Sequence, residues 1–143
     1  MSPVFLGVDY GKARIGVAVS DDLGMMAHAL ETVANNGAPA IERLKTLATE
    51  RKAERFIVGL PRNMDGSEGA SAQEARSFAE RLGLSSGLPV ELRDERLTTA
   101  GAQRLFHDAG VNTKKSRNRI DMAAAQLILQ SYLDSRQMDV DPL

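Results

Sequence analysis

The opening of the chain places the tightest constraint on the fold. The stretch FLGVDYGKARIGVAVSD, residues 5–21, holds two β-rich apolar runs on either side of a short turn that contains Gly11. This pattern predicts a β-hairpin in which Gly11 provides the positive φ of a tight turn. The first run ends in a carboxylate, Asp9. A buried ionised carboxylate is costly unless it is paired or binds a metal ion, so Asp9 is the first candidate functional residue.

The rest of the chain predicts a mixed α/β sheet. Hydrophobic patterning indicates strands over residues 4–9, 15–20, 25–33, 55–60 and 88–94, and helices over 38–53, 71–82 and 120–135. The motif SAQE is a capping box for the second helix, and Thr98 or Thr99 can cap a further helix to about Ala109. Residues 110–119 lack periodicity and predict a loop, and the tail after Arg136 is expected to fray. This order implies one domain, residues 1–143, with helices on both faces of a five-stranded sheet.

Composition excludes several classes of site. The chain has no Cys and only two histidines, so thiolate and multi-histidine metal sites are excluded. It shows no signal region and no apolar run long enough to span a bilayer, so we expect a soluble, cytoplasmic protein that does not act at a membrane. The net charge of −1 predicts no general attraction to nucleic acid, but KKSRNR, residues 114–119, holds four cations in six positions and can bind a polyanion locally.

Three acids are placed where they can converge. Asp9 ends one predicted strand, and the acids of DERLTT, Asp94 and Glu95, lie at the carboxyl end of another; such strand ends form the ligand-binding edge of open α/β sheets. Asp121 shares the inward face of the last predicted helix with small apolar residues. Each acid also has a structural explanation: turn capping for Asp9, a surface ion pair for the DER segment, and the helix dipole for Asp121. Together they predict an all-oxygen site for Mg²⁺ or Mn²⁺, the chemistry of phosphodiester cleavage.

Two segments predict contacts to a nucleic-acid backbone. The loop VGLPRNMDGSEG, residues 58–69, follows a strand and precedes a helix, so we expect free backbone N–H groups there that suit a phosphate. It is not a Walker A loop, and an aromatic content of 4% argues against a base-stacking platform. The candidate nucleic-acid-binding residues are Lys12, Arg14, Arg62, Asn63, Arg96, Lys114, Lys115, Arg117 and Arg119.

Four segments resemble, in order and spacing, the signatures of the YqgF/RuvX family: GVDYGKARIGVAVSD, VGLPRNMDGSEG, DERLTT and IDMAAAQLILQSYLD. The resemblance extends from Phe5 to Asp134. It implies an RNase H-like fold, with three antiparallel strands followed by two parallel ones, and metal-dependent hydrolysis of nucleic-acid phosphodiesters. By position it assigns Asp9, Glu95 and Asp121 as catalytic metal ligands for Mg²⁺ or Mn²⁺, and leaves the role of Asp94 open. Family members are described as Holliday junction resolvases of DNA recombination and repair, and as nucleases that mature the 5′ end of pre-16S rRNA in ribosome biogenesis.

Two other functions stay open at this point. The hairpin also resembles the phosphate-binding hairpin of the actin, Hsp70 and sugar kinase superfamily, which would make the chain a single-lobe nucleotide-binding protein. A basic loop with purely structural acids would make it a non-catalytic RNA- or ribosome-binding factor. Within the nuclease interpretation, structured RNA and branched DNA are both open as substrates. The mode of cleavage and the choice between monomer and homodimer are open as well.

Overall fold

The computed structural model describes residues 2–98 and 114–140, and within them five strands form one mixed sheet. The strand order is β3-β2-β1-β4-β5; β1, β2 and β3 pair antiparallel, whereas β4 pairs parallel with β1, and β5 pairs parallel with β4. This arrangement confirms the predicted sheet. The strands are β1 Val4–Tyr10, β2 Arg14–Ser20, β3 Ala27–Ala34, β4 Ala53–Leu60 and β5 Val90–Asp94; the helices are α1 Ala38–Arg51, α2 Ala70–Ser86, the short η1 Glu95–Leu97 and α4 Lys114–Val140.

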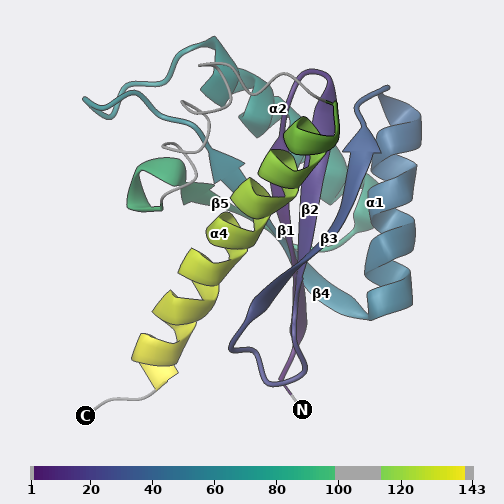
Figure 1. The fold of residues 1–143 in the computed structure, drawn as a ribbon, viewed down its shortest axis with the longest axis vertical. Helices are drawn as coiled ribbons and strands as arrows, with labels where there is room; N and C mark the ends of the chain where they lie inside the picture. The colour runs from purple at the N-terminus through teal and green to yellow at the C-terminus, as the bar shows by residue number, and fades with distance from the viewer. Residues whose placement is uncertain (1, 99–113, 141–143) are drawn as a thin grey trace.

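Helices cover both faces of the sheet, as the sequence predicts. Along β1, Leu6 and Val8 point into a core cluster shared with α1 and α2, whereas Phe5 belongs to a second cluster built around Ala125 and Leu129 of α4. This alternation follows from the period of two along a strand. Figure 1 shows α4 running diagonally across the sheet face nearest the viewer. No helix in the described ranges has the length and apolarity needed to cross a membrane.

Glycines in the strands let α4 lie close against the sheet. An added Cβ at Gly7 of β1 would lie 2.6 Å from Leu129 Cβ and 2.9 Å from the Ala125 carbonyl oxygen. An added Cβ at Gly16 of β2 would collide with the carbonyl oxygen of Asp121. These distances are too short for any side chain, so the two positions require glycine for helix packing.

Three local predictions at the turns and caps are wrong. Gly11 has no positive φ; it is needed because an added Cβ would lie 2.5 Å from the Arg14 carbonyl oxygen. The SAQE segment is not a capping box, because α2 begins one residue before it, with Gly69 as N-cap and no side-chain capping bond. β3 begins at Ala27 rather than Met25, because the Asp21 carboxylate accepts the Met25 N–H at 3.0 Å and closes the turn before the strand.

The last helix is longer than predicted at both ends. Residues 114–119, predicted as a loop, form the first turns of α4, and the predicted frayed tail is helical to Val140. The residues of these first turns, KKSRNR, are all polar, so no apolar stripe marks them as helical in the sequence. The carbonyl oxygen of Asn118 accepts a hydrogen bond from Thr32 Oγ1 at 3.2 Å, which joins this end of α4 to β3. The helix predicted to end near Ala109 lies outside the described residues beyond Thr98.

Candidate active site

Asp9 lies at the carboxyl end of the central strand and faces α4. It is 4% exposed and pairs in register with Gly16 of β2. Side chains two residues apart on a strand share a face, so Asp9 points the same way as Gly7, which lies directly beneath Leu129 of α4. The carboxylate that the sequence singled out is therefore buried beneath the last helix.

Asp121 reaches the same region from α4. Its backbone lies against Gly16, the register partner of Asp9. Its carboxylate Oδ2 accepts a hydrogen bond of 2.8 Å from Nε of Arg14, and the two side chains are only 14% and 23% exposed. Arg14 stands two residues before Gly16 on β2, so its side chain is on the α4 face. Arg14, predicted to bind nucleic acid, is therefore ion-paired with a predicted metal ligand.

Glu95 approaches from the other side of Asp9. It begins η1, directly after β5, and is 3% exposed. The parallel pairing of β1 and β4 ends at Val8–Val58, and the next residue of β4 is Gly59, beside Asp9. An added Cβ at Gly59 would lie 3.2 Å from Glu95 Cγ, so Glu95 crosses over this glycine. Burial, and secondarily the charge of Asp94, raises the pKa of Glu95 to about 7.

The three acids therefore gather on one face around Asp9, over a pair of flanking glycines, Gly16 and Gly59. Their donor chemistry fits a hard divalent cation, because all are carboxylates, and a bound cation would offset the cost of ionising the buried Glu95. Within residues 2–98 and 114–140, however, no three His, Cys, Asp or Glu residues are grouped closely enough to hold a metal ion. The acids share a region without forming a complete ligand cluster.

Asp94 organises the arginines beside this region. Its carboxylate accepts the Arg96 backbone N–H at 2.9 Å, which caps η1, and Arg96 Nη2 at 2.8 Å. Arg62 Nη1 lies 3.6 Å from Asp94 Oδ2, and Arg62 Nη2 lies 3.3 Å from Glu68 Oε2. Hydrogen bonds from Arg96 hold the pKa of Asp94 below its usual value. The sequence indicated the ion pair within the DER segment, which Asp94 and Arg96 form, but not the contact with Arg62, because Arg62 and Asp94 come from different strand ends.

The loop between β4 and α2 is held together by its own hydrogen bonds. The N–H groups of Asn63, Gly66 and Ser67 are bonded to Ser67, Asn63 and Asp65. The expectation of freely available N–H groups in this loop is wrong for these three, because a tight turn satisfies them internally. The Asn63 amide also donates to Ser67 Oγ at 2.9 Å.

The remaining predicted nucleic-acid contacts lie around the same edge. Lys12 is 81% exposed on the β1–β2 turn, 3.8 Å from Glu74 of α2. Arg119 is exposed on the first turns of α4. Lys114, Lys115 and Arg117 belong to the start of α4, and their side chains lie outside the described part of the chain.

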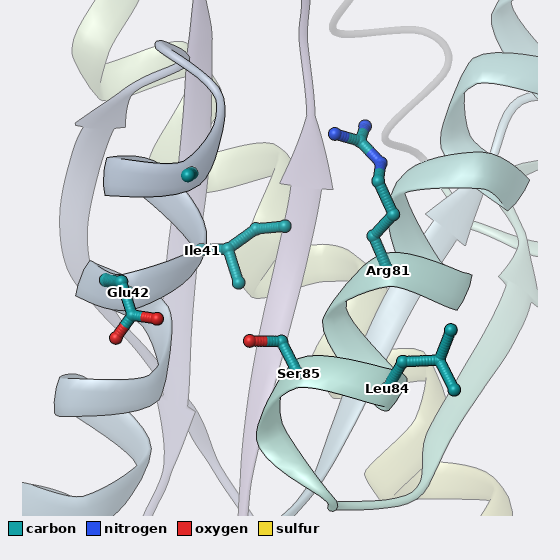
Figure 2. A pocket seen from close by; sticks show the side chains of 6 residues that line it. Ile41, Glu42, Arg81, Leu84 and Ser85 are labelled. Carbon is teal, nitrogen blue, oxygen red and sulfur yellow. The ribbon is translucent and has the colours of Figure 1, made fainter.

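A hollow on the opposite face is separate from this region. It has a volume of about 370 Å³ and lies between α1 and α2. Figure 2 shows Ile41 of α1 and Ser85 of α2 pointing toward one another across this hollow, with the sheet behind them. Because Asp9 faces α4, this hollow is on the far side of the sheet from the three acids.

Comparison with known proteins identifies the family. Residues 3–135 match the family described as RuvX, Holliday junction resolvase. The chain belongs to the RuvX family. The resemblance seen in the four sequence segments is therefore confirmed, and with it membership of a family of nucleases.

Curated relatives of this RuvX chain carry the name "Putative pre-16S rRNA nuclease". The relative from Pelotomaculum thermopropionicum is 45% identical over 133 residues, covering 92% of this chain and 86% of that protein. The one from Myxococcus xanthus is 46% identical over 138 residues, covering 95% and 91%. The one from Lactococcus lactis subsp. lactis is 43% identical over 136 residues, covering 93% and 95%.

Solved structures agree on the fold of the RuvX chain. Thermus thermophilus RuvC in complex with a Holliday junction substrate matches with a TM-score of 0.53 and 16% identity, over 96% of this chain and 97% of that one. A second Thermus thermophilus RuvC structure matches with a TM-score of 0.52 and 15% identity, over 94% and 96%. The predicted RNase H-like fold is confirmed.

Proposed function

We propose that this protein is a divalent-metal-dependent nuclease that hydrolyses nucleic-acid phosphodiester bonds, with Asp9, Glu95 and Asp121 as the ligands of Mg²⁺ or Mn²⁺. The observation that carries the proposal is the gathering of these acids around Asp9 beneath α4. Two of them are almost fully buried, and a strand end crowded with carboxylates is destabilising without a cation.

In this proposal the acidic residues would hold the metal ion and the basic residues would position the substrate. When bound, a divalent ion of this kind lowers the pKa of a water and stabilises charge on the leaving oxygen. Asp9 holds its carboxylate rigidly on a central strand, and Glu95 is turned inward by the Asp94 cap of η1. Lys12, Arg62, Arg96 and Arg119 surround this edge and would position the phosphate backbone without reading sequence.

We propose the 5′ end of pre-16S rRNA as the substrate. The support is the name shared by relatives that are 43–46% identical over more than nine-tenths of this chain. Such a substrate would place the enzyme in the cytoplasm. Branched DNA is the second candidate, because the description of the matching family is Holliday junction resolvase.

The test is cleavage of a labelled panel: an RNA spanning the precursor end, a four-way DNA junction and single strands. Each is incubated with Mn²⁺, Mg²⁺ or EDTA. Asp9→Asn should abolish metal-dependent cleavage. The matched control is Asp22→Asn, an exposed acid on the β2–β3 turn at the opposite end of the sheet, which should cleave as the wild type does.

The preferred substrate in that panel decides between rRNA maturation and junction resolution. Cleavage that survives in Asp9→Asn or in EDTA would contradict the metal-site proposal. Binding of RNA without cleavage of any substrate would favour a non-catalytic RNA- or ribosome-binding factor. A thermal shift on ATP addition would favour a nucleotide-binding lobe.

A further inference from the structure

We infer that Arg14 is a positioning residue that holds the Asp121 carboxylate in an ion pair and must release it for a divalent cation to bind there. The inference rests on the proposed metal-dependent nuclease function. It concerns what this chain's own arginine does to a carboxylate needed for metal binding.

The first support is that the Arg14–Asp121 ion pair is shielded from water. Among the ion pairs of residues 2–98 and 114–140, Arg14–Asp121 has both the least exposed cation, at 23%, and the least exposed acid, at 14%. Shielding from water strengthens the attraction between opposite charges. By contrast, the Arg43–Glu31 pair is 41% and 31% exposed.

The second support is the place of the pair in the sheet. Asp9 is the register partner of Gly16, Asp121 lies against Gly16, and Arg14 is two residues before Gly16 on the same face. Arg14 is therefore next to the gathering of acids. Its guanidinium places a positive charge beside Asp121, in the region that Asp9 and Glu95 share, and so offsets negative charge there.

The third support is that the ligand cluster is incomplete while the pair is made. In the described residues no three potential ligands are grouped to hold a cation, although Asp9, Glu95 and Asp121 share the region. Oδ2 of Asp121 is engaged by Arg14 Nε at 2.8 Å. A divalent ion and Arg14 therefore compete for the same carboxylate, and the released guanidinium becomes available to a substrate phosphate.

The experiment measures Mn²⁺ affinity by titration calorimetry and electron paramagnetic resonance on the full chain, without nucleic acid. Arg14→Gln should bind Mn²⁺ at least about fivefold more tightly than the wild type, the low end of typical coupling between sites. Arg43→Gln breaks the Arg43–Glu31 ion pair, which is remote from the acids, and should leave the affinity unchanged. Asp121→Asn should bind Mn²⁺ more weakly than the wild type.

A second readout follows the arginine itself. In a Mg²⁺ titration monitored by NMR, the Arg14 Nε–H resonance should shift as the pair is released. The Arg43 Nε–H, bonded to Glu31 at 2.7 Å, should stay in place. If Arg14→Gln does not fold, Arg14→Lys is measured instead; it keeps the charge, loses the planar guanidinium, and should bind Mn²⁺ more tightly by a smaller factor.

The outcomes separate this inference from the proposed function. If the wild type binds Mn²⁺ and the Arg14 variants bind it no more tightly, Arg14 does not compete with metal and the inference is overturned, while the nuclease proposal stands. Tighter binding by the variants supports competition. Absence of Mn²⁺ binding in the wild type and all variants would overturn both.

Discussion

The backbone of Asp121 lies directly on Gly16, so closely that the carbonyl oxygen of Asp121 occupies the space of a Cβ at position 16. We expect Gly16→Ala to push α4 away from β2 and to lower the free energy of unfolding by about 1–3 kcal/mol, the usual cost of overpacking. It should also reduce cleavage, because Asp121 moves with the helix. Urea denaturation and the cleavage panel measure both effects.

The control for that substitution is Gly83→Ala in α2. There an added Cβ would be 3.4 Å from Val90 Cγ2, an ordinary contact, and φ is not positive. A helical glycine replaced by alanine should stabilise the protein by roughly 0.5–1 kcal/mol. Equal destabilisation by the two variants would show that Gly16 has no special role in helix packing.

The raised pKa of Glu95 predicts a pH-dependent stability in the absence of metal. Between the usual pKa of 4.5 and the folded value of about 7, Glu95 keeps its proton in the folded state and loses it on unfolding. Stability therefore falls as pH rises through this window and levels off above it. At pH 8, Glu95→Gln should be more stable than the wild type by on the order of 2 kcal/mol, and at pH 4 nearly equal to it.

Denaturation at several pH values in EDTA measures this difference. Glu54→Gln, a change at an exposed glutamate, serves as the control and should keep the wild-type pH dependence. A wild-type slope unchanged by Glu95→Gln would mean that burial of Glu95 does not control its ionisation. Added Mg²⁺ should narrow the gap between wild type and Glu95→Gln, because the cation stabilises the ionised carboxylate.

The contacts that Asp94 makes with Arg62 and Arg96 predict opposite effects on nucleic-acid binding and on cleavage. In Asp94→Asn the amide oxygen can still accept the Arg96 N–H, but the negative charge facing Arg62 and Arg96 is lost. Nucleic-acid affinity should rise and its dependence on salt should steepen by up to about 0.7 per additional phosphate contact on a single strand. Cleavage should fall, because the two arginines are no longer oriented.

Binding at several salt concentrations and cleavage rates measure the effect of Asp94→Asn. Asp94→Ala also removes the cap of η1 and should cost about 1 kcal/mol of stability beyond the Asn variant. If Asp94→Asn binds and cleaves as the wild type does, Asp94 has no part in orienting the arginines.

The start of α4 provides a test of the binding surface. Replacing Lys114, Lys115, Arg117 and Arg119 with Gln should weaken nucleic-acid binding and flatten its salt dependence by roughly 0.7 per lost contact on single strands. The charge-matched control replaces Lys45, Arg51, Lys52 and Arg55, around the end of α1 and the start of β4, away from the carboxyl end of β1. If only the control variant shows a weaker salt dependence of binding, the nucleic acid binds near the end of α1 and the start of β4 instead.

Local sequence patterns predicted the regular elements well where they are apolar. The alternation in residues 4–9 and 15–20 and the apolar stripe of 120–135 correspond to β1, β2 and most of α4. These patterns failed where a close backbone contact across a tight turn decides the conformation, and where the segment is polar. Gly11 is required by the nearby carbonyl of Arg14, and the first turns of α4 are polar on all sides.

The sequence by itself determined the succession of strands and helices and the family, and it singled out three candidate acids, because these reside in local hydrophobic periodicity and in motifs of adjacent residues. The tertiary structure alone decided that Arg14 is paired with Asp121, that Asp94 joins Arg62 to Arg96, and that Glu95 is buried over Gly59. Each of these depends on sheet register and on the closeness of α4 to the glycines beneath it. These contacts join segments that are far apart in the chain, so local patterns do not predict them. The pKa of a buried carboxylate such as Glu95 likewise depends on what surrounds it in space.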